Sequence, residues 1–135
     1  MSVVYQLIRP AKVRLLVYQG TTFARKFVLN LGDDPFPFTA GHGLADWSAR
    51  MDVREFVKSE SCLLSATTEN GRLVIAADGT ESSYSIRFNA ETTAALPDGE
   101  HVYDIELVRA SDGFVLRIQE GKVRVKPEVT RGCNG

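Results

Sequence analysis

The sequence has only two cysteines, Cys62 and Cys133, among its 135 residues. They are too few and too far apart for a zinc site or a disulfide-stabilised scaffold. No apolar run approaches the roughly 20 residues that a membrane-spanning helix requires. The first residues also lack the charged start, apolar block and cleavage site of a secretory signal. We therefore expect neither a membrane protein nor a secreted disulfide scaffold.

Residues that commonly catalyse reactions are equally scarce. The chain has two histidines, His42 and His101, and none of the HExxH, GxSxG, CxxC or phosphate-binding glycine motifs. The carboxylates Asp33 and Asp34 are of the kind that binds metal, but no second ligand cluster is visible, and an Asp-Asp pair before Pro35 is typical of a turn. We expect no enzyme, no metal and no cofactor.

What the sequence does contain is the composition of one globular domain. Hydrophobic residues make up 44% and charged residues 24% of the chain. These values exclude a disordered, collagenous or coiled-coil protein as a reading of the whole chain. A chain of this length buries roughly two-thirds of its unfolded surface on folding, which is enough for a substantial core.

Charge is distributed unevenly along the chain. Residues 1–32 have five basic and no acidic side chains, residues 33–116 have six basic and fifteen acidic ones, and residues 117–135 have five basic and two acidic ones. The three net charges of +5, −9 and +3 sum to −1. Two basic ends around an acidic middle favour contacts between unlike surfaces over nucleic-acid binding. The alternative is that both ends are strands that lie beside the acidic strands of the same fold.

Alternation of apolar and polar residues is the strongest pattern in the sequence. From Ala45 to Arg54 every odd position is apolar and every even position is polar, which predicts a strand with one face in a core. The same alternation predicts strands around Val13–Val17, Tyr84–Phe88, Tyr103–Leu107, Phe114–Ile118 and Val123–Val125. The alternation places Gln119 on the polar side with Arg117.

Two of the strands carry further expectations. The strand at Val123–Val125 is predicted as a last edge strand, ended by Pro127, which cannot donate to a ladder. The segment Thr22–Asn30 is strand-like, but Arg25 shares a face with its phenylalanines, so we expect a bulge or a register change there.

Turn residues separate the strands at short distances. Asn70-Gly71 predicts a two-residue type I′ hairpin between Leu63–Thr68 and Leu73–Ala77, and Asp78-Gly79 a further turn. Asp112-Gly113 predicts a tight hairpin between the Tyr103 and Phe114 strands. Asn89 is positioned to cap one or two helical turns in Ala90–Leu96, before Pro97-Asp98-Gly99. About eight short strands, mostly joined by hairpins, predict a β-sandwich with one small helix.

We divide the chain into an N-terminal arm (1–11), a β-sandwich domain (12–126) and a C-terminal tail (127–135). Cys62, in an apolar stretch, is expected to be a small buried residue. The predicted core lies on the apolar faces of the alternating segments. It consists of Val17, Phe27, Trp47, Ala49, Met51, Leu64, Leu73, Ile75, Tyr84, Ile86, Phe88, Tyr103, Ile105, Leu107, Leu116 and Ile118.

The longest stretch without alternation is Leu31–Leu44, which has two prolines and three glycines. A loop of this kind is often functional, although it can also be the packed end of a sandwich. Phe36 and Phe38 are candidates for exposed contacts, and hydrophobic plugs at the end of a sandwich have the same sequence pattern. Trp47 lies on the apolar side of a regular alternation, which favours core packing over sugar stacking.

The order of these segments resembles a known family. The segments that carry the resemblance are Gly20–Phe27, Trp47–Arg54, Thr67–Ile75, Glu91–Pro97, Tyr103–Leu107, Gly113–Val115 and Gly121–Val125. They resemble the small immunoglobulin-like β-sandwich proteins of tailed bacteriophages and prophages, and are similar to the N-terminal domain of upper baseplate proteins. The resemblance covers roughly residues 15–130 and involves framework residues, not a catalytic signature.

The resemblance implies an all-β, immunoglobulin-like antiparallel β-sandwich and a non-enzymatic virion component. Such a protein docks to copies of itself and to neighbouring tail, neck, baseplate or capsid proteins, and is assembled in the bacterial host cytoplasm. Two departures from the family favour a stand-alone adaptor or accessory protein: the long loop Leu31–Leu44 and the absence of a fibre-like extension after the sandwich. The alternative function is a cell-surface adhesin or a carbohydrate-binding module.

We expect the docking surfaces where the chain departs from hairpin regularity or carries the charge asymmetry. These are the N-terminal segment Met1–Lys12, the loop Asp33–His42 and the basic segment Lys122–Arg131. The candidate interface residues are Arg9, Lys12, Asp33, Asp34, Phe36, Phe38, His42, Lys122, Arg124, Lys126, Arg131 and Cys133. Cys133 is expected to be exposed, either as a free thiol or as a thiol that cross-links to a neighbouring subunit after release from the cell. The rival is an internal bond to Cys62, which is disfavoured by the position of Cys62 in an apolar strand, because a disulfide needs Cα atoms within about 7 Å.

Overall fold

A computed structural model describes residues 9–31, 34–36, 44–79 and 81–133 of the chain. In chain order its elements are β1 (Ala11–Lys12), β2 (Leu15–Tyr18), β3 (Phe23–Leu31), β4 (Asp34–Pro35), a 3-10 helix η2 (Leu44–Asp46), β5 (Trp47–Arg54), β6 (Leu64–Thr67), β7 (Leu73–Asp78), β8 (Glu81–Phe88), α1 (Ala90–Ala94), β9 (Gly99–Arg109) and β10 (Phe114–Lys126). No helix among the described residues is both long and apolar enough to cross a membrane.

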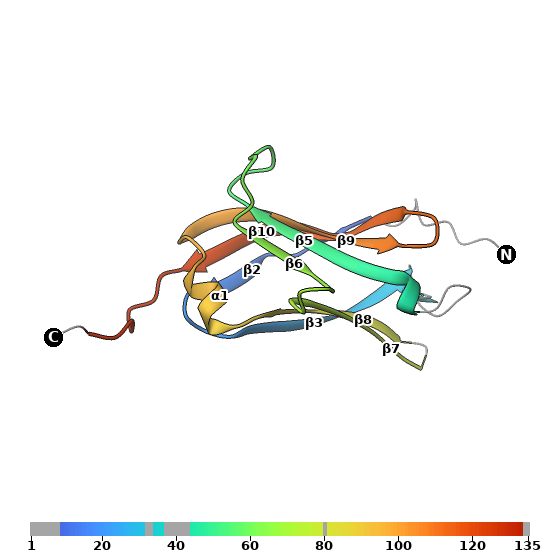
Figure 1. Ribbon diagram of the computed structural model, residues 1–135, viewed down its shortest axis with the longest axis horizontal. Coiled ribbons are helices and arrows are strands. Elements are labelled where there is room, and N and C mark those ends of the chain that lie inside the picture. The colour runs from blue at the N-terminus through green and yellow to red at the C-terminus, as the bar shows by residue number, and fades with distance from the viewer. Residues whose placement is uncertain (1–8, 32–33, 37–43, 80, 134–135) are drawn as a thin grey trace.

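The strands form two sheets that pack face to face as a β-sandwich (Figure 1). The first sheet has six strands in the order β1-β10-β9-β5-β6, with β2 also paired to β10, and the second has four strands in the order β4-β3-β8-β7. The predicted β-sandwich with one short α-helix is thus confirmed. The expectation of purely antiparallel pairing is wrong, because β1 and β2 both run parallel to β10.

Strand β10 is continuous over 13 residues, where the sequence predicted two separate strands. Its predicted edge position is wrong, since it lies between β9 and the N-terminal strands β1 and β2. A register shift between Arg117 and Gln119 marks a β-bulge at Ile118. Because of the bulge, Gln119 is fully buried in the core, and the prediction that it faces outward is also wrong. The strand ends at Lys126, directly before Pro127, as predicted.

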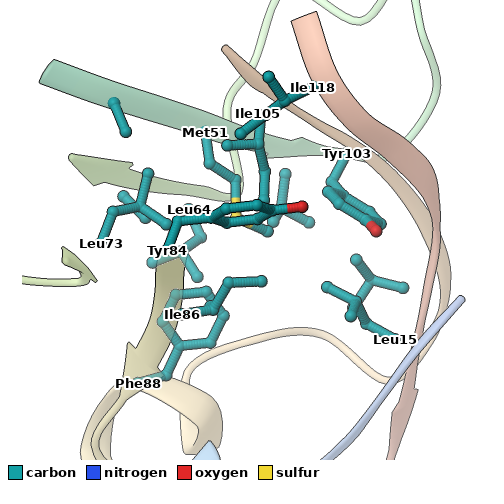
Figure 2. Close-up of a cluster of buried hydrophobic side chains, with 14 of the residues drawn as sticks. Leu15, Met51, Leu64, Leu73, Tyr84, Ile86, Phe88, Tyr103, Ile105 and Ile118 are labelled. Atoms are coloured by element: carbon teal, nitrogen blue, oxygen red, sulfur yellow. The ribbon is translucent and has the colours of Figure 1, made fainter. Parts of the chain in front are cut away.

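The core lies between the sheets, where the alternation placed it (Figure 2). In β5 every odd residue is buried, and every even residue is partly or fully exposed. All the predicted core residues are buried except Phe27 and Ile75, which are partly buried and pack against the others. Met51 and Ile105 from the first sheet face Tyr84 and Ile86 from the second in Figure 2. Each large side chain contributes roughly 1.5–3 kcal/mol by its burial, which is opposed by the entropy of ordering the chain.

Two of the three predicted turns join paired strands. Asp112-Gly113 closes the β9–β10 hairpin, and Asp78-Gly79 lies between the paired strands β7 and β8. The third prediction is wrong: Asn70-Gly71 does not close a hairpin, because β6 pairs with β5 in the first sheet and β7 with β8 in the second. This turn therefore carries the chain from one sheet to the other.

The short helix α1 forms as predicted at one end of the sandwich (Figure 1). The Asn89 side chain accepts a hydrogen bond of 2.8 Å from the Thr92 amide, which satisfies one of the free donors at the helix start. Inside the helix, the hydroxyl of the buried Thr93 donates to Thr21 O at 2.7 Å and connects α1 to the β2–β3 turn.

Two local expectations fail. Strand β3 pairs with β8 in continuous register from Phe23 to Leu29, so the expected bulge at Arg25 is absent from this segment. Arg25 instead lies over the Phe27 ring, with 4.9 Å between the guanidinium carbon and the ring centroid. Cys62 is exposed rather than buried, because it lies in the loop before β6 and not within the strand.

Candidate interaction surface

The outer face of the six-stranded sheet carries a dense array of charged side chains, which we call the charged face. Its members project outward from β5, β9 and β10, on the side opposite the core. They are Arg50, Asp52, Arg54, Asp104, Glu106, Arg117, Glu120 and Lys122. Period-two alternation accounts for this arrangement, because the residues between them supply the apolar inner face of the same strands.

Ion pairs connect these side chains across neighbouring strands. Arg50 Nε lies 2.9 Å from a carboxylate oxygen of Glu106, one strand away. Arg117 lies among three carboxylates, with distances of 3.5 Å to Asp104, 3.9 Å to Glu106 and 3.6 Å to Glu120. Most of these side chains are well exposed, so each pair adds little to the free energy of folding. Their main effect is to hold charges of both signs in fixed positions on the surface.

Three carboxylates nevertheless form a row across the charged face. Asp52 on β5 is directly opposite Asp104 on β9, which is directly opposite Glu120 on β10. Partial burial raises the pKa of Asp104, and the neighbouring carboxylates add to that rise, while Arg117 opposes it. Like charges in directly opposite positions of a sheet are unfavourable. Each carboxylate of the row also has a basic neighbour, Arg54 at Asp52, Arg117 at Asp104 and Lys12 at Glu120, so the repulsion within the row is offset inside the chain.

A hollow of about 410 Å³ lies over this row. Gly121 contributes to its floor, and a side chain cannot replace the glycine, because a Cβ there would lie 2.3 Å from Val13 O. Val57 lines the hollow from the loop between β5 and β6, which projects from the sandwich above the first sheet in Figure 1. Phe56 and Val57 in this loop are 56% and 80% exposed, so apolar groups lie beside the charged ones.

The loop between β5 and β6 is tied to the charged face. Arg54 Nη1 donates to Ser59 O at 3.0 Å, while Arg54 Nη2 lies 2.9 Å from Asp52. The Ser59 amide donates to Phe56 O at 3.0 Å and closes a turn at the loop tip. The apolar tip is thus held near the hollow by the same arginine that pairs with the acidic row.

The two basic ends of the chain lie beside acidic strands of the same fold. Lys12 Nζ is 2.7 Å from Glu120, and Arg14 and Lys122 are each 3.2 Å from Glu100. The hydrogen bond from Lys12 lowers the pKa of Glu120, and the one from Lys122 lowers the pKa of Glu100. Part of the basic charge at the two ends is therefore paired with acidic residues within the chain. This agrees with the alternative from the sequence, in which both ends are strands that lie beside acidic strands of the same fold.

The remaining basic candidates lie along β10 and beyond it. Arg124 and Lys126 project outward beside the buried Val123 and Val125, as the alternation predicted, and neither has an ion pair among the described residues. Arg131 in the tail donates to Glu128 O and is exposed. Arg9 and Cys133, near the two ends, are also exposed. Of the candidate set, the structure gathers Lys12, Lys122, Arg124 and Lys126 on adjoining strands β1 and β10.

The loop candidates do not join this group. Phe36 is buried at 1% exposure and packs edge-on against Trp47, with 5.5 Å between ring centroids, so it is a hydrophobic plug and not an exposed contact. Trp47 is in the core, as predicted. Asp34 lies in β4, which pairs with the end of β3. Asp33, Phe38 and His42 lie outside the described residues. No group of potential metal ligands occurs among the residues that the structure does describe.

Beneath the charged face, a buried polar network connects the two sheets. Tyr84 OH from the second sheet donates to Gln119 Oε1, and Gln119 Nε2 donates to Tyr103 OH at 2.9 Å. Tyr103 OH in turn donates to Val13 O at 2.6 Å. Figure 2 shows the two tyrosines in the middle of the core, with the Tyr84 hydroxyl directed towards Tyr103. The network holds the N-terminal segment against β10, next to the hollow.

Sequence reasoning found the basic residues of β10 but missed the acidic row and the hollow. The alternation did assign Asp52, Asp104 and Arg117 to polar faces, which was a usable signal. Placing them side by side requires the order of the strands, which one sequence does not provide. A scan against models of known protein families finds no match, and a search of curated proteins also finds none.

Proposed function

We propose that the protein is an immunoglobulin-like docking module of a tailed-bacteriophage virion. Support for the fold comes from strand connectivity, because immunoglobulin-type sandwiches place strands B, E and D in one sheet and C, F and G in the other. Taking β3, β5, β7, β8, β9 and β10 as B to G gives β3-β8-β7 and β10-β9-β5, which is the same arrangement. The parallel pairing of β2 with β10 is an addition to it.

Two side chains lie where immunoglobulin domains have characteristic ones. The buried Trp47 is on β5, which corresponds to strand C. His101 lies near the start of β9, at the corner after α1, and its Nε2 is 2.7 Å from Pro97 O. Immunoglobulin domains use a tyrosine hydroxyl for a corresponding bond to the backbone at this corner. These positions add to the support that the strand order gives for the proposed fold.

The observation that carries the docking function is the charged face with its adjoining apolar loop tip. Exposed ion pairs contribute little to stability, so their number on this one face is better explained by recognition. Patterned charge fixes which partner binds and in which register. Phe56 and Val57 supply the apolar contact that the centre of a protein interface usually needs. A partner that fits the hollow would present charges of both signs, because four acidic and three basic side chains line it.

The virion role has its support in the family resemblance over roughly residues 15–130, and it is tested on particles. Virions purified from the phage or prophage that encodes the chain should contain it at a fixed ratio to the other structural proteins, measured by mass spectrometry. Its absence from purified particles would remove the virion role. Binding of the isolated protein to a glycan array would instead favour the adhesin or carbohydrate-binding alternative.

A pair of valine variants tests the docking surface itself. Val57→Asp places a charge at the hollow, and we expect it to reduce incorporation into particles without changing the fold, because Val57 is 80% exposed. Val28→Asp is the control, since Val28 is 51% exposed on the four-stranded sheet. Equal incorporation of both variants would show that the partner does not bind at the charged face.

A further inference from the structure

The two sheets of the sandwich end in four edges, and three of them are protected. The edge strand β2 is only four residues long and is separated from β1 by a break in pairing, and short edge strands resist pairing with other chains. In the second sheet the short strand β4 pairs only with Asn30 and Leu31, so the rest of β3 is an edge as well. This part of β3 carries the exposed Arg25 and Lys26, and charge on an edge strand has the same effect.

Strand β6 is protected by side chains that occupy its free backbone groups. Asn70 Oδ1 accepts from the Thr67 amide at 2.9 Å, and Asn70 Nδ2 donates to Ser65 O at 3.0 Å. Arg72 Nη1 donates to the same Ser65 oxygen at 2.9 Å. These bonds take the places that a strand from another molecule would use.

Strand β7, which follows directly after that turn, has no such protection from the residues that the structure describes. Its sequence from Leu73 to Ala77 is free of charge, proline and glycine. Its pairing with β8 is regular from Leu73–Ile86 to Asp78–Glu81, without a bulge. A regular, uncharged edge strand is a template for pairing with a further strand.

The hydrogen bonds identify which groups of β7 are free. The Arg87 amide donates to Arg72 O at 2.8 Å, so the pair Arg72–Arg87 is a hydrogen-bonded one. In an antiparallel ladder such pairs alternate with non-bonded ones, so the backbone groups of Leu73, Ile75 and Ala77 point away from β8. None of these three residues has another hydrogen bond within the described part of the chain.

We propose that β7 pairs antiparallel with β7 of a second copy of this chain, about a two-fold axis at Ile75. In that register Ile75 is opposite Ile75 of the second copy, and Leu73 is opposite Ala77. All the free amide and carbonyl groups of both strands are then used. If the register of the two strands shifts by one residue, the free groups of one strand come opposite residues whose own groups point towards β8. If it shifts by two residues, one of the three residues in each copy has no partner.

The side chains agree with the same register. Arg72 at one end of β7 comes opposite Asp78 at the other end of the second copy, so unlike charges meet twice in a two-fold arrangement. Arg72 uses one Nη1 bond on Ser65, and a guanidinium has five donors, so others are available to Asp78. Asp78 is exposed and has no ion pair among the described residues. Strand β7 is thus complementary to itself in both hydrogen bonds and charge, and this is why its partner is a second copy of the chain.

This self-pairing goes beyond the proposed function, since it involves a different surface and is measured in solution without any virion. Sedimentation equilibrium of the purified chain should give a mass that rises from 14.9 kDa towards twice that value as the concentration increases. Ala77→Pro removes one outward amide, at an edge position where β8 needs no donor, and should abolish the rise.

Charge variants give a test that does not alter the strand backbone. Asp78→Arg places two arginines opposite each other at both ends of the paired strands and should also give a monomer at concentrations where the native chain associates. Asp98→Arg makes the same change of charge at an exposed residue after α1 and should associate like the native chain. Circular dichroism checks that each variant is folded. A native chain that stays monomeric at every concentration, or β7 variants that associate as the native chain does, would overturn the proposal.

Discussion

Polar side chains line both faces of the β9–β10 hairpin, and the two faces use them in opposite ways. On the inner face, Gln119 is fully buried and connects Tyr84 to Tyr103 through a few hydrogen bonds. On the outer face, Arg117 and Glu120 belong to a larger set of ion pairs that are open to water. Because water competes for exposed charges but not for buried groups, the few inner bonds should affect stability more than the many outer ones.

The largest effect is expected for Gln119→Ala. This change leaves the buried Tyr84 hydroxyl without its acceptor and opens a cavity in the core. We expect the free energy of unfolding to fall by about 2–3 kcal/mol, measured by denaturant titration. The adjacent Glu120→Ala is the matched control on the other face and should cost less than about 1 kcal/mol. Equal losses in the two variants would contradict the comparison.

A smaller loss is expected for Asn70→Ala, which removes a polar side chain outside the β9–β10 hairpin. Asn70 is exposed, but it bonds backbone groups of Ser65, Thr67 and Arg72. Loss of these bonds should lower the free energy of unfolding by about 1 kcal/mol and speed hydrogen exchange at the Thr67 amide. Asn70→Asp keeps the acceptor oxygen and should recover most of the loss. A Thr67 amide that exchanges at the native rate in Asn70→Ala would show that Asn70 does not protect β6.

Regular and irregular strands differ in how well the sequence predicts which of their side chains are buried. The pattern from Trp47 to Arg54 fixes a strand and its buried face, because alternation is a local property and β5 has no irregularity. For Gln119 the same pattern predicts the wrong face, since the bulge at Ile118 shifts the alternation by one residue. Arg117 and Gln119, which flank Ile118, are not glycines, so the sequence has no local signal that predicts the bulge.

Long-range partners are the other part that the sequence does not predict. Asn70-Gly71 has the residues of a hairpin turn, yet β6 and β7 belong to different sheets, because each strand buries its apolar face against the opposite layer. Likewise, Lys12 and Glu120 are 108 residues apart and meet only through the parallel pairing of β1 with β10. The composition of the basic ends is visible in the sequence, but their neutralisation by Glu100 and Glu120 depends on strand order.

The difference in the free energy of unfolding between the native chain and Glu120→Gln should depend on pH. Lys12 lowers the pKa of Glu120 in the folded protein, so the ionised carboxylate stabilises the fold above its ordinary pKa of 4.5. This contribution is lost as the pH falls through the lowered folded-state pKa. The native chain should therefore be slightly more stable than Glu120→Gln at neutral pH, and the difference should disappear in acid. Glu60→Gln, at an exposed glutamate with no ion pair among the described residues, is the matched control and is measured over the same pH range.

The smallest effect is expected for Asp104→Asn, with the opposite sign. The pKa of Asp104 is raised by partial burial and by Glu106, Asp52 and Glu120, so its ionised form is unfavourable in the folded protein. Replacement by the neutral amide should increase the free energy of unfolding at neutral pH by a few tenths of a kcal/mol, in the range of a single cross-strand pair. Because a raised carboxyl pKa costs stability only while the group is ionised, this gain should shrink as the pH falls towards the ordinary value of 3.8. Arg117 would lose one of its three carboxylate neighbours but keep Glu106 and Glu120. A loss of stability in Asp104→Asn would mean that the pair with Arg117 outweighs the repulsion within the acidic row.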